Sequence, residues 1–357
     1  MQKESKRNTN IEILRIVSML MIVAHHYVYY GVMQNYDSGI AHLSYQQGSV
    51  INKIIAQLLM PGGIVGVGLF FLIMGYFGIQ SNNINIKQIV KDTLFYSILG
   101  LFIYIACGIC GLFDLYNLKD SILSCVNPVA NSTYWFISVY IIISMMKPVL
   151  NNAILAIGGG YKTLYFIIIL LVYYSFVRYN AAVYLGIING LVFYIFGALI
   201  KKNEEMLCQK KRSQYLFFGL IGWILYVLFN NISWLNVHSL DGLFSIVGIC
   251  FFGTVSIIGL SLFFLSGKKY INTKINILAS TTFSVYLIHE HPLVRRLLWS
   301  NIFHVDTLQW HSPCFILLAL ISIILIFAFS AIFELARKRL FAFIRFSFNK
   351  IKHNPSL

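Results

Sequence analysis

Long apolar stretches recur along this chain and constrain its fold more than any other feature. About 20 predominantly apolar residues are enough for a helix to cross the hydrocarbon core of a bilayer. Charged residues make up only 11% of the chain, against about 25% in soluble proteins. The sequence therefore predicts an all-α integral membrane fold with about ten transmembrane helices, in a single domain over residues 1–357. The ten expected spans are 11–33, 59–79, 93–113, 132–150, 163–179, 183–200, 215–231, 243–265, 276–298 and 313–335.

The distribution of Lys and Arg predicts how these spans cross the membrane. With a cytoplasmic N-terminus, 21 of the 27 basic residues lie in inside segments, five lie in outside segments, and Arg15 lies within the first span. This bias follows the positive-inside rule, so we expect both ends, including a basic tail at 337–357, to be cytoplasmic. The net charge of +15 then reflects topology, and no nucleic-acid partner is expected. The lack of an organelle signal suits a multi-pass protein of a bacterial plasma membrane.

Arg15 and His26 form the first candidate site. Eleven residues at about 100° each make three turns plus roughly 20°, so both side chains share one helix face, about 16 Å apart along the axis. His25 points about 100° away. Ionisable groups are costly within a membrane, and such a pair is a functional-site hypothesis by default. The alternatives are an Arg15 side chain that reaches the headgroups and a His26 ring satisfied by an interhelical hydrogen bond.

A second group of ionisable residues interrupts the ninth expected span. His289, Glu290 and His291 follow one another within SVYLIHEHPL, and His289 lies about 21 Å from the cytoplasmic start of that helix. His26 lies at a similar expected depth, about 22 Å from its own side. His289 and Glu290 are therefore candidates to orient a catalytic imidazole or to bind the hydroxyls of a polar acceptor. The alternative is that the helix ends here and these residues lie in the outer interface.

Other candidates rest on weaker signals. Arg295 and Arg296 lie at the outer end of the ninth span, where they suit either an anionic acceptor or ordinary lipid headgroups. Lys87 and Lys91 flank the cytoplasmic start of the third span, where they suit either topology or the phosphates of a nucleotide-like donor. Trp135 begins the fourth span from outside, where an aromatic-belt role is the default.

No metal or redox site is expected from the sequence. Cys107 and Cys110 form a CxxC pair, but within an apolar run where small residues serve helix contacts. The histidines outside the spans show no spacing typical of metal ligands.

The residues resemble a known family. Arg15 and His26, separated by ten residues, are similar to the signature of the membrane acyltransferase 3 family, whose bacterial members O-acetylate envelope glycans. Three further stretches resemble family patterns: GIVGVGLFFLIMGYF at 63–77, STYWFISVYIIISMMKPVL at 132–150 and SVYLIHEHPL at 284–293. Two departures stand out. Met74 replaces a serine common in the family, and Lys87 and Lys91 stand where many members carry an arginine-rich segment.

The resemblance implies transfer of an acyl group across the membrane. The donor would be cytoplasmic acetyl-CoA or another short acyl-CoA, with its phosphates near Arg15 and with Lys87 and Lys91 as helpers. His26 would act as general base, oriented or assisted by Glu290 or His289. A covalent acyl-imidazole intermediate remains an open alternative. The acceptor would be an envelope polysaccharide or a lipid-linked sugar, with Trp135, Arg295 and Arg296 as candidate contacts.

Three other classes of membrane protein fit the composition. A transporter or flippase for a lipid-linked glycan would use the same buried charges, but it would usually show inverted repeats, which we do not detect. A glycan polymerase would favour a large outside loop with several arginines, and the longest expected outside loop, about 34–58, has none. A purely structural protein gives no reason for Arg15 and His26 to share a face. Dependence on acyl-CoA would distinguish an acyltransferase from all three of these classes.

Overall fold

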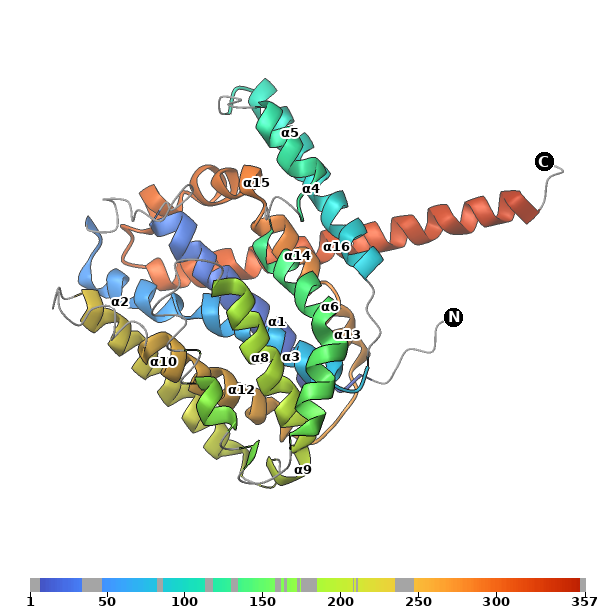
Figure 1. Ribbon diagram of the computed structural model, residues 1–357. Helices are drawn as coiled ribbons and strands as arrows, with labels where there is room; N and C mark the ends of the chain where they lie inside the picture. Colours follow the sequence, from blue (N-terminus) through green and yellow to red (C-terminus); the bar gives the residue numbers. More distant parts are fainter. Residues whose placement is uncertain are drawn as a thin grey trace.

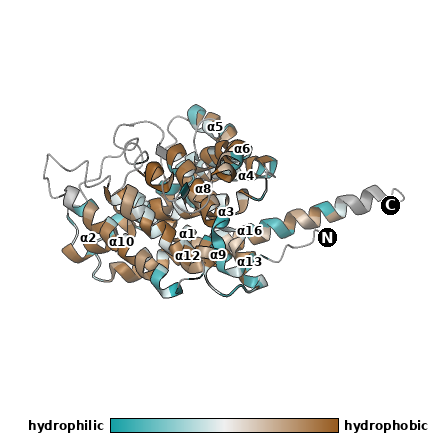
Figure 2. Ribbon diagram, turned by 60° about the horizontal axis from the view of Figure 1, so that its bottom comes forward, coloured by the Kyte–Doolittle hydropathy of each residue, from teal (hydrophilic) through white to brown (hydrophobic). Residues whose placement is uncertain are grey.

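The fold is known from a computed structural model. It describes residues 7–33, 47–81, 86–112, 118–129, 134–157, 162–163, 166–171, 174, 185–207, 209, 211–234 and 247–353. In these ranges every regular element is helical (Figure 1). Seven helical stretches there are long and apolar enough to cross a membrane: Thr9–Val32, Val50–Gly78, Ile86–Ile109, Trp135–Ala156, Arg212–Asn231, Val247–Leu265 and Phe315–Ser347. Apolar residues dominate the ribbon and polar ones gather at loops and helix ends (Figure 2).

These stretches correspond to most of the expected spans. They contain α1 (Thr9–His26) with η1 (Tyr27–Val32), α2 (Val50–Leu59), α3 (Gly62–Gly78), α4 (Ile86–Ile109), α6 (Trp135–Ala156), α10 (Arg212–Trp234), η3 (Val247–Gly253), α12 (Thr254–Leu265) and α16 (Phe315–His353). The expected span at 183–200 is α8 (Leu185–Lys202). The span at 163–179 lies largely outside the described residues. The total of ten and the cytoplasmic ends stay predictions.

Helix α1 lies at the centre of the bundle because its neighbours approach it closely (Figure 1). Asn8 caps its N-terminus by accepting a hydrogen bond from the backbone N–H of Asn10. A Cβ atom on Gly66 of α3 would lie 2.6 Å from the carbonyl oxygen of Ser18, so only glycine permits this contact. Small residues allow membrane helices to pack at such short distances. The glycine-rich segment therefore brings α3 against the helix that carries Arg15 and His26.

The ninth expected span, 276–298, is not one helix, and that prediction was wrong. The chain forms α13 (Thr273–Ala279), α14 (Thr282–His289), α15 (Pro292–Arg296) and η4 (Leu297–Ile302). Two physical causes are visible. The hydroxyls of Thr281 and Thr282 donate to the carbonyls three residues earlier and compete with the regular helix pattern. Pro292 lacks an N–H and begins a new helix, which the His291 side chain caps.

Helix α16 is longer than its expected span of 313–335. It comprises 39 residues and runs away from the rest of the molecule toward the C-terminus (Figure 1). The first part of the expected tail, 337–353, thus continues this helix. Arg337 links α16 to α4, because its guanidinium lies 2.9 Å from Asp92 of α4; it also lies 2.7 Å from Glu334 of its own helix.

Two short helices complete the described elements between the long ones. They are α5 (Leu118–Val126), which follows α4, and α9 (Glu204–Leu207), which follows α8. A further π-helical turn, η5 (Val305–Gln309), precedes α16 and packs against η1.

Candidate active site

Two histidines from distant parts of the chain meet inside the bundle. His26 closes α1 and His289 closes α14, and their ring nitrogens Nδ1 and Nε2 lie 3.0 Å apart. His26 is 8% exposed and His289 is fully buried. A π-helical turn, η1, begins directly after His26, and such turns are frequent at functional sites. The structure thus places together the two imidazoles that the sequence put at a similar depth.

Hydrogen-bond partners fix which nitrogen of each ring carries the proton. Nδ1 of His289 lies 2.6 Å from the backbone carbonyl oxygen of Val285, which only accepts, so this nitrogen is the N–H donor. In a neutral ring Nε2 of His289 is then an acceptor, and Nδ1–H of His26 donates to it. Nε2 of His26 is left with its lone pair. None of the described residues forms a hydrogen bond with that nitrogen.

A carboxylate stands beside the histidine pair. Oε2 of Glu290 lies 3.2 Å from Nδ1 of His26. The other oxygen accepts a 2.8 Å hydrogen bond from the hydroxyl of Tyr30 and lies 3.9 Å from the guanidinium of Arg295. Arg295 also donates to the Tyr30 hydroxyl at 2.9 Å and lies over its ring. Glu290 is therefore buried in a network that holds its charge next to His26.

The third ionisable residue of the sequence motif faces elsewhere. His291 accepts a hydrogen bond from the backbone N–H of Leu293 and donates from Nε2 to the carbonyl of Ser97 on α4. Its ring fills the space beside Gly100, where a Cβ atom would overlap it. His289, Glu290 and His291 are all buried inside the protein.

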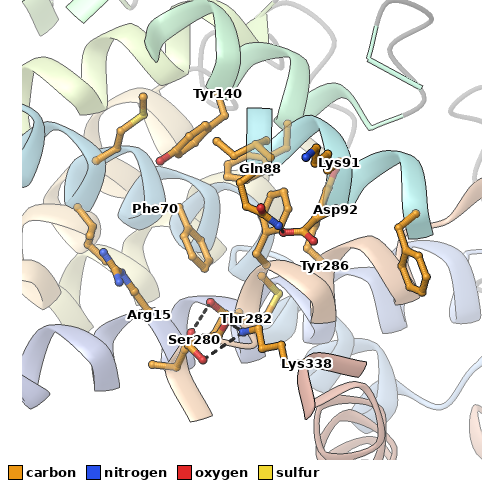
Figure 3. A pocket seen from close by; sticks show the side chains of 18 of the residues that line it. Arg15, Phe70, Gln88, Lys91, Asp92, Tyr140, Ser280, Thr282, Tyr286 and Lys338 are labelled. Atoms are coloured by element: carbon orange, nitrogen blue, oxygen red, sulfur yellow. Dashed lines mark hydrogen bonds between the residues drawn. The ribbon is translucent and has the colours of Figure 1, made fainter. Parts of the chain in front are cut away.

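A large cavity opens beside α1, on the side of Arg15. Its volume is about 1390 Å³. Positive charge on its wall comes from Arg15, Lys91 and Lys338, which Figure 3 shows, and from Lys147 and Arg337. Asp92 is the one acidic residue among the described lining residues. The cavity is thus a basic chamber suited to an anionic ligand.

The inner end of the cavity is aromatic and faces the histidine pair. Tyr286 and Phe136 line it, with their ring centroids 5.3 Å apart. The Tyr286 ring in turn lies 6.1 Å from the His289 ring, nearly perpendicular to it. One aromatic layer therefore separates the basic cavity from the buried imidazoles.

The other candidates from the sequence fall into two groups. Lys91 lines the cavity with Arg15, and Arg295 belongs to the Glu290 network. Lys87 and Arg296 are exposed and touch neither part. Trp135 is 39% exposed and lies beside Gly186 of α8 and Phe136.

Three residues of this region were missed by the sequence analysis. Tyr30 follows His26 by four residues, and this helical spacing is the signal that would have found it. Lys147 and Arg337 were counted only as topology charges, although Lys147 stands alone next to a long apolar run. The place of both on the cavity wall, and the burial of Lys147, are tertiary properties that sequence spacing does not contain.

Comparison with known proteins identifies the family. A family model described as an acyltransferase domain, that of the acyltransferase 3 family, matches residues 8–333. The chain therefore belongs to the acyltransferase 3 family, and it is a multi-pass membrane acyltransferase. No curated protein and no solved structure matched it. Within the described residues no group of three or more His, Cys, Asp or Glu side chains has the arrangement of a metal site.

Proposed function

We propose that this protein is an O-acyltransferase that moves an acetyl or other short acyl group from cytoplasmic acyl-CoA to a hydroxyl of an envelope glycan or lipid-linked sugar. The observation that carries the proposal is the tautomer of His26. Its Nδ1–H is engaged by His289, so Nε2 is free to accept a proton. A neutral imidazole held in this way is suited to general-base catalysis.

The reaction follows from these groups. Nε2 of His26 takes the proton of the acceptor hydroxyl as its oxygen attacks the thioester carbonyl. The C–S bond breaks, the new ester forms, and the proton on His26 passes to the departing CoA thiolate. The Glu290 carboxylate, 3.2 Å from His26, stabilises the transient imidazolium. Such a base typically contributes about 10²–10⁴-fold to the rate.

The cavity supports an acyl-CoA as donor. Its volume of about 1390 Å³ exceeds the roughly 300–1,000 Å³ usual for drug-sized ligands. Arg15 and Lys91 suit the phosphates, with Lys87 as a helper from the exposed side. The aromatic inner end suits the uncharged pantetheine arm and the thioester. A transfer step at His26 then requires the Phe136–Tyr286 layer to open.

The acceptor would approach from the other side of that layer. Arg295 and Arg296 are the last two residues of α15, which begins shortly after Glu290. Trp135 is the first residue of α6. Cationic and aromatic side chains of this kind suit an anionic or sugar-bearing acceptor. In this proposal the protein works in a bacterial plasma membrane and modifies an envelope polysaccharide or its lipid-linked precursor.

Label transfer from radioactive acetyl-CoA tests the proposal. Purified protein in nanodiscs would receive labelled acetyl-CoA and a crude envelope-glycan fraction. Wild type would be compared with Arg15→Ala, His26→Ala and an exposed control, Lys211→Ala. We expect label in the glycan with wild type and the control, and none with His26→Ala. If the protein were a transporter or flippase, folded wild type would transfer no label and would bind no acetyl-CoA. If His26→Ala stayed active, His26 would not be the general base.

A further inference from the structure

Lys147 is a charged residue of the cavity wall that is buried without an acidic partner among the described residues. It lies in α6 immediately before Pro148 and is only 8% exposed. It lines the cavity, yet it has no ion pair or hydrogen bond to any residue that the structure describes. A buried ammonium without a counter-ion is costly unless something else neutralises it. Its position therefore calls for an anion from outside the chain.

Three neighbouring cations differ from Lys147 because each already has an acidic partner, and a fourth, Lys91, is exposed. Arg15 lies 3.1 Å from Glu12. Arg337 and Lys338 share Glu334, and Arg337 also holds Asp92. These pairs neutralise part of the positive charge on that part of the wall. Lys147 carries the buried, unmatched charge.

The spacing on α6 places Lys147 at a useful distance from the inner end of the cavity. Phe136, Tyr140 and Lys147 all line the cavity, and Figure 3 shows Tyr140 facing the same space as Arg15. Lys147 follows Phe136 by eleven residues, which is three turns plus about 20° and about 16 Å along the axis. Arg15 and His26 have the same separation on α1. Lys147 thus lies about as far along α6 from Phe136 as Arg15 lies along α1 from His26.

We propose that Lys147 anchors a phosphate group of the acyl-CoA donor and so positions the thioester at the inner end of the cavity. This inference rests on the proposed function. A lysine ammonium binds phosphate as a point charge with up to three donors, and a charge-assisted hydrogen bond is the stronger kind. Arg15 and Lys91 would then hold the same anionic end from other sides of the chamber.

Binding of CoA and of pantetheine, which lacks the phosphates, tests the proposal. Affinities would be measured by calorimetry for wild type, Lys147→Met, Lys147→Arg and the exposed control Lys211→Met. We expect Lys147→Met to weaken CoA binding at least about tenfold and to leave pantetheine binding unchanged. Lys147→Arg should restore most of the affinity, and the control should match wild type. In acetyl transfer, Lys147→Met should raise the KM for acetyl-CoA with a smaller effect on kcat.

The outcomes distinguish a failure of the Lys147 assignment from a failure of the proposed acyltransferase function. If wild type binds CoA and Lys147→Met binds it equally well, the Lys147 assignment is wrong and the acyltransferase proposal stands. If folded wild type binds no CoA, both fail. If Lys147→Met loses only binding of short-chain phosphatidylglycerol, measured in parallel, the anion is a lipid headgroup and the CoA assignment is overturned.

A second measurement needs no variant and covers the case in which Lys147→Met does not fold. Reductive methylation of wild-type lysines would be followed by mass spectrometry with and without CoA. We expect CoA to slow the modification of Lys147 several-fold and to leave Lys211 unaffected. Equal modification of Lys147 in both samples would contradict the proposal.

Discussion

Backbone carbonyls determine which ring nitrogen carries the proton in His289 and in His291. Val285 accepts from Nδ1 of His289, whereas Ser97 accepts from Nε2 of His291. The two rings are therefore opposite tautomers, although only one residue separates them. In His289 this leaves Nε2 as an acceptor for His26. A backbone carbonyl of α14 thus determines the tautomer of a ring on α1.

Replacing Glu290 with glutamine tests the electrostatic part of this arrangement. The amide oxygen can still accept the hydrogen bond from Tyr30, but the negative charge beside His26 is lost. We expect kcat for acetyl transfer to fall about 10- to 100-fold, because the imidazolium is no longer stabilised. The KM for acetyl-CoA should stay unchanged. Steady-state kinetics over acetyl-CoA concentration check this, with exposed Glu205→Gln as control, and an unchanged kcat would contradict the role of the charge.

Much of α1 and its site could be predicted from sequence because helical spacing is a local property. The shared face of Arg15 and His26 and the similar depth of His26 and His289 follow from counting residues. The break inside 276–298 did not follow, because hydroxyl groups and one proline redirect an otherwise apolar run. The burial of Lys147 on a cavity wall depends on packing between α6 and other helices, which no local pattern records.

Contacts between α3 and α8 depend on glycine in the same way as those with α1. A Cβ atom on Gly75 would overlap the backbone carbonyl of Tyr194, and the backbone cannot yield as a side-chain end can. We expect Gly75→Ala to lower the free energy of unfolding by about 1–3 kcal/mol through overpacking. Chemical unfolding in detergent measures this. Gly253→Ala is the matched control, since its nearest atom would be 3.8 Å away, and equal stability losses would refute the argument.

The ion pairs of Arg337, with Asp92 of α4 and with Glu334 of its own helix α16, give a second prediction. Arg337→Met leaves Glu334, which is 2% exposed, with only the partly exposed Lys338 as counter-ion. Removing one partner of a buried pair typically costs about 3–5 kcal/mol. We therefore expect a clearly lower thermal midpoint in detergent for Arg337→Met than for the exposed control Arg339→Met. Identical midpoints would show that the pairs do not hold the two helices together.

At the scale of the whole molecule, the cavity proposed for the acyl donor and the histidines proposed for catalysis lie in different places. The basic cavity lies on the side of Arg15, and the paired imidazoles lie beyond the aromatic layer of Phe136 and Tyr286. With the predicted topology, in which most Lys and Arg lie in the inside segments, the cavity mouth would face the cytoplasm. Acyl-CoA would therefore enter from the side on which it is made.

Accessibility of Gln88 tests this orientation. Gln88 lines the cavity and is exposed, so Gln88→Cys in a cysteine-free background should react with a membrane-impermeant maleimide. We expect labelling in inside-out vesicles, no labelling in right-side-out vesicles, and protection by CoA. Labelling from the outer side alone would reverse the predicted topology.

The aromatic layer has a consequence for the membrane itself. Phe136 and Tyr286 line the chamber and are only 5% and 2% exposed. A continuous water path from the chamber to the far side would let protons leak and would drain the proton-motive force of the cell. An enzyme that moves an acyl group across a bilayer, as proposed above, would therefore have to open for its substrate without conducting protons. In the proposed mechanism the contact between the Phe136 and Tyr286 rings would provide that insulation.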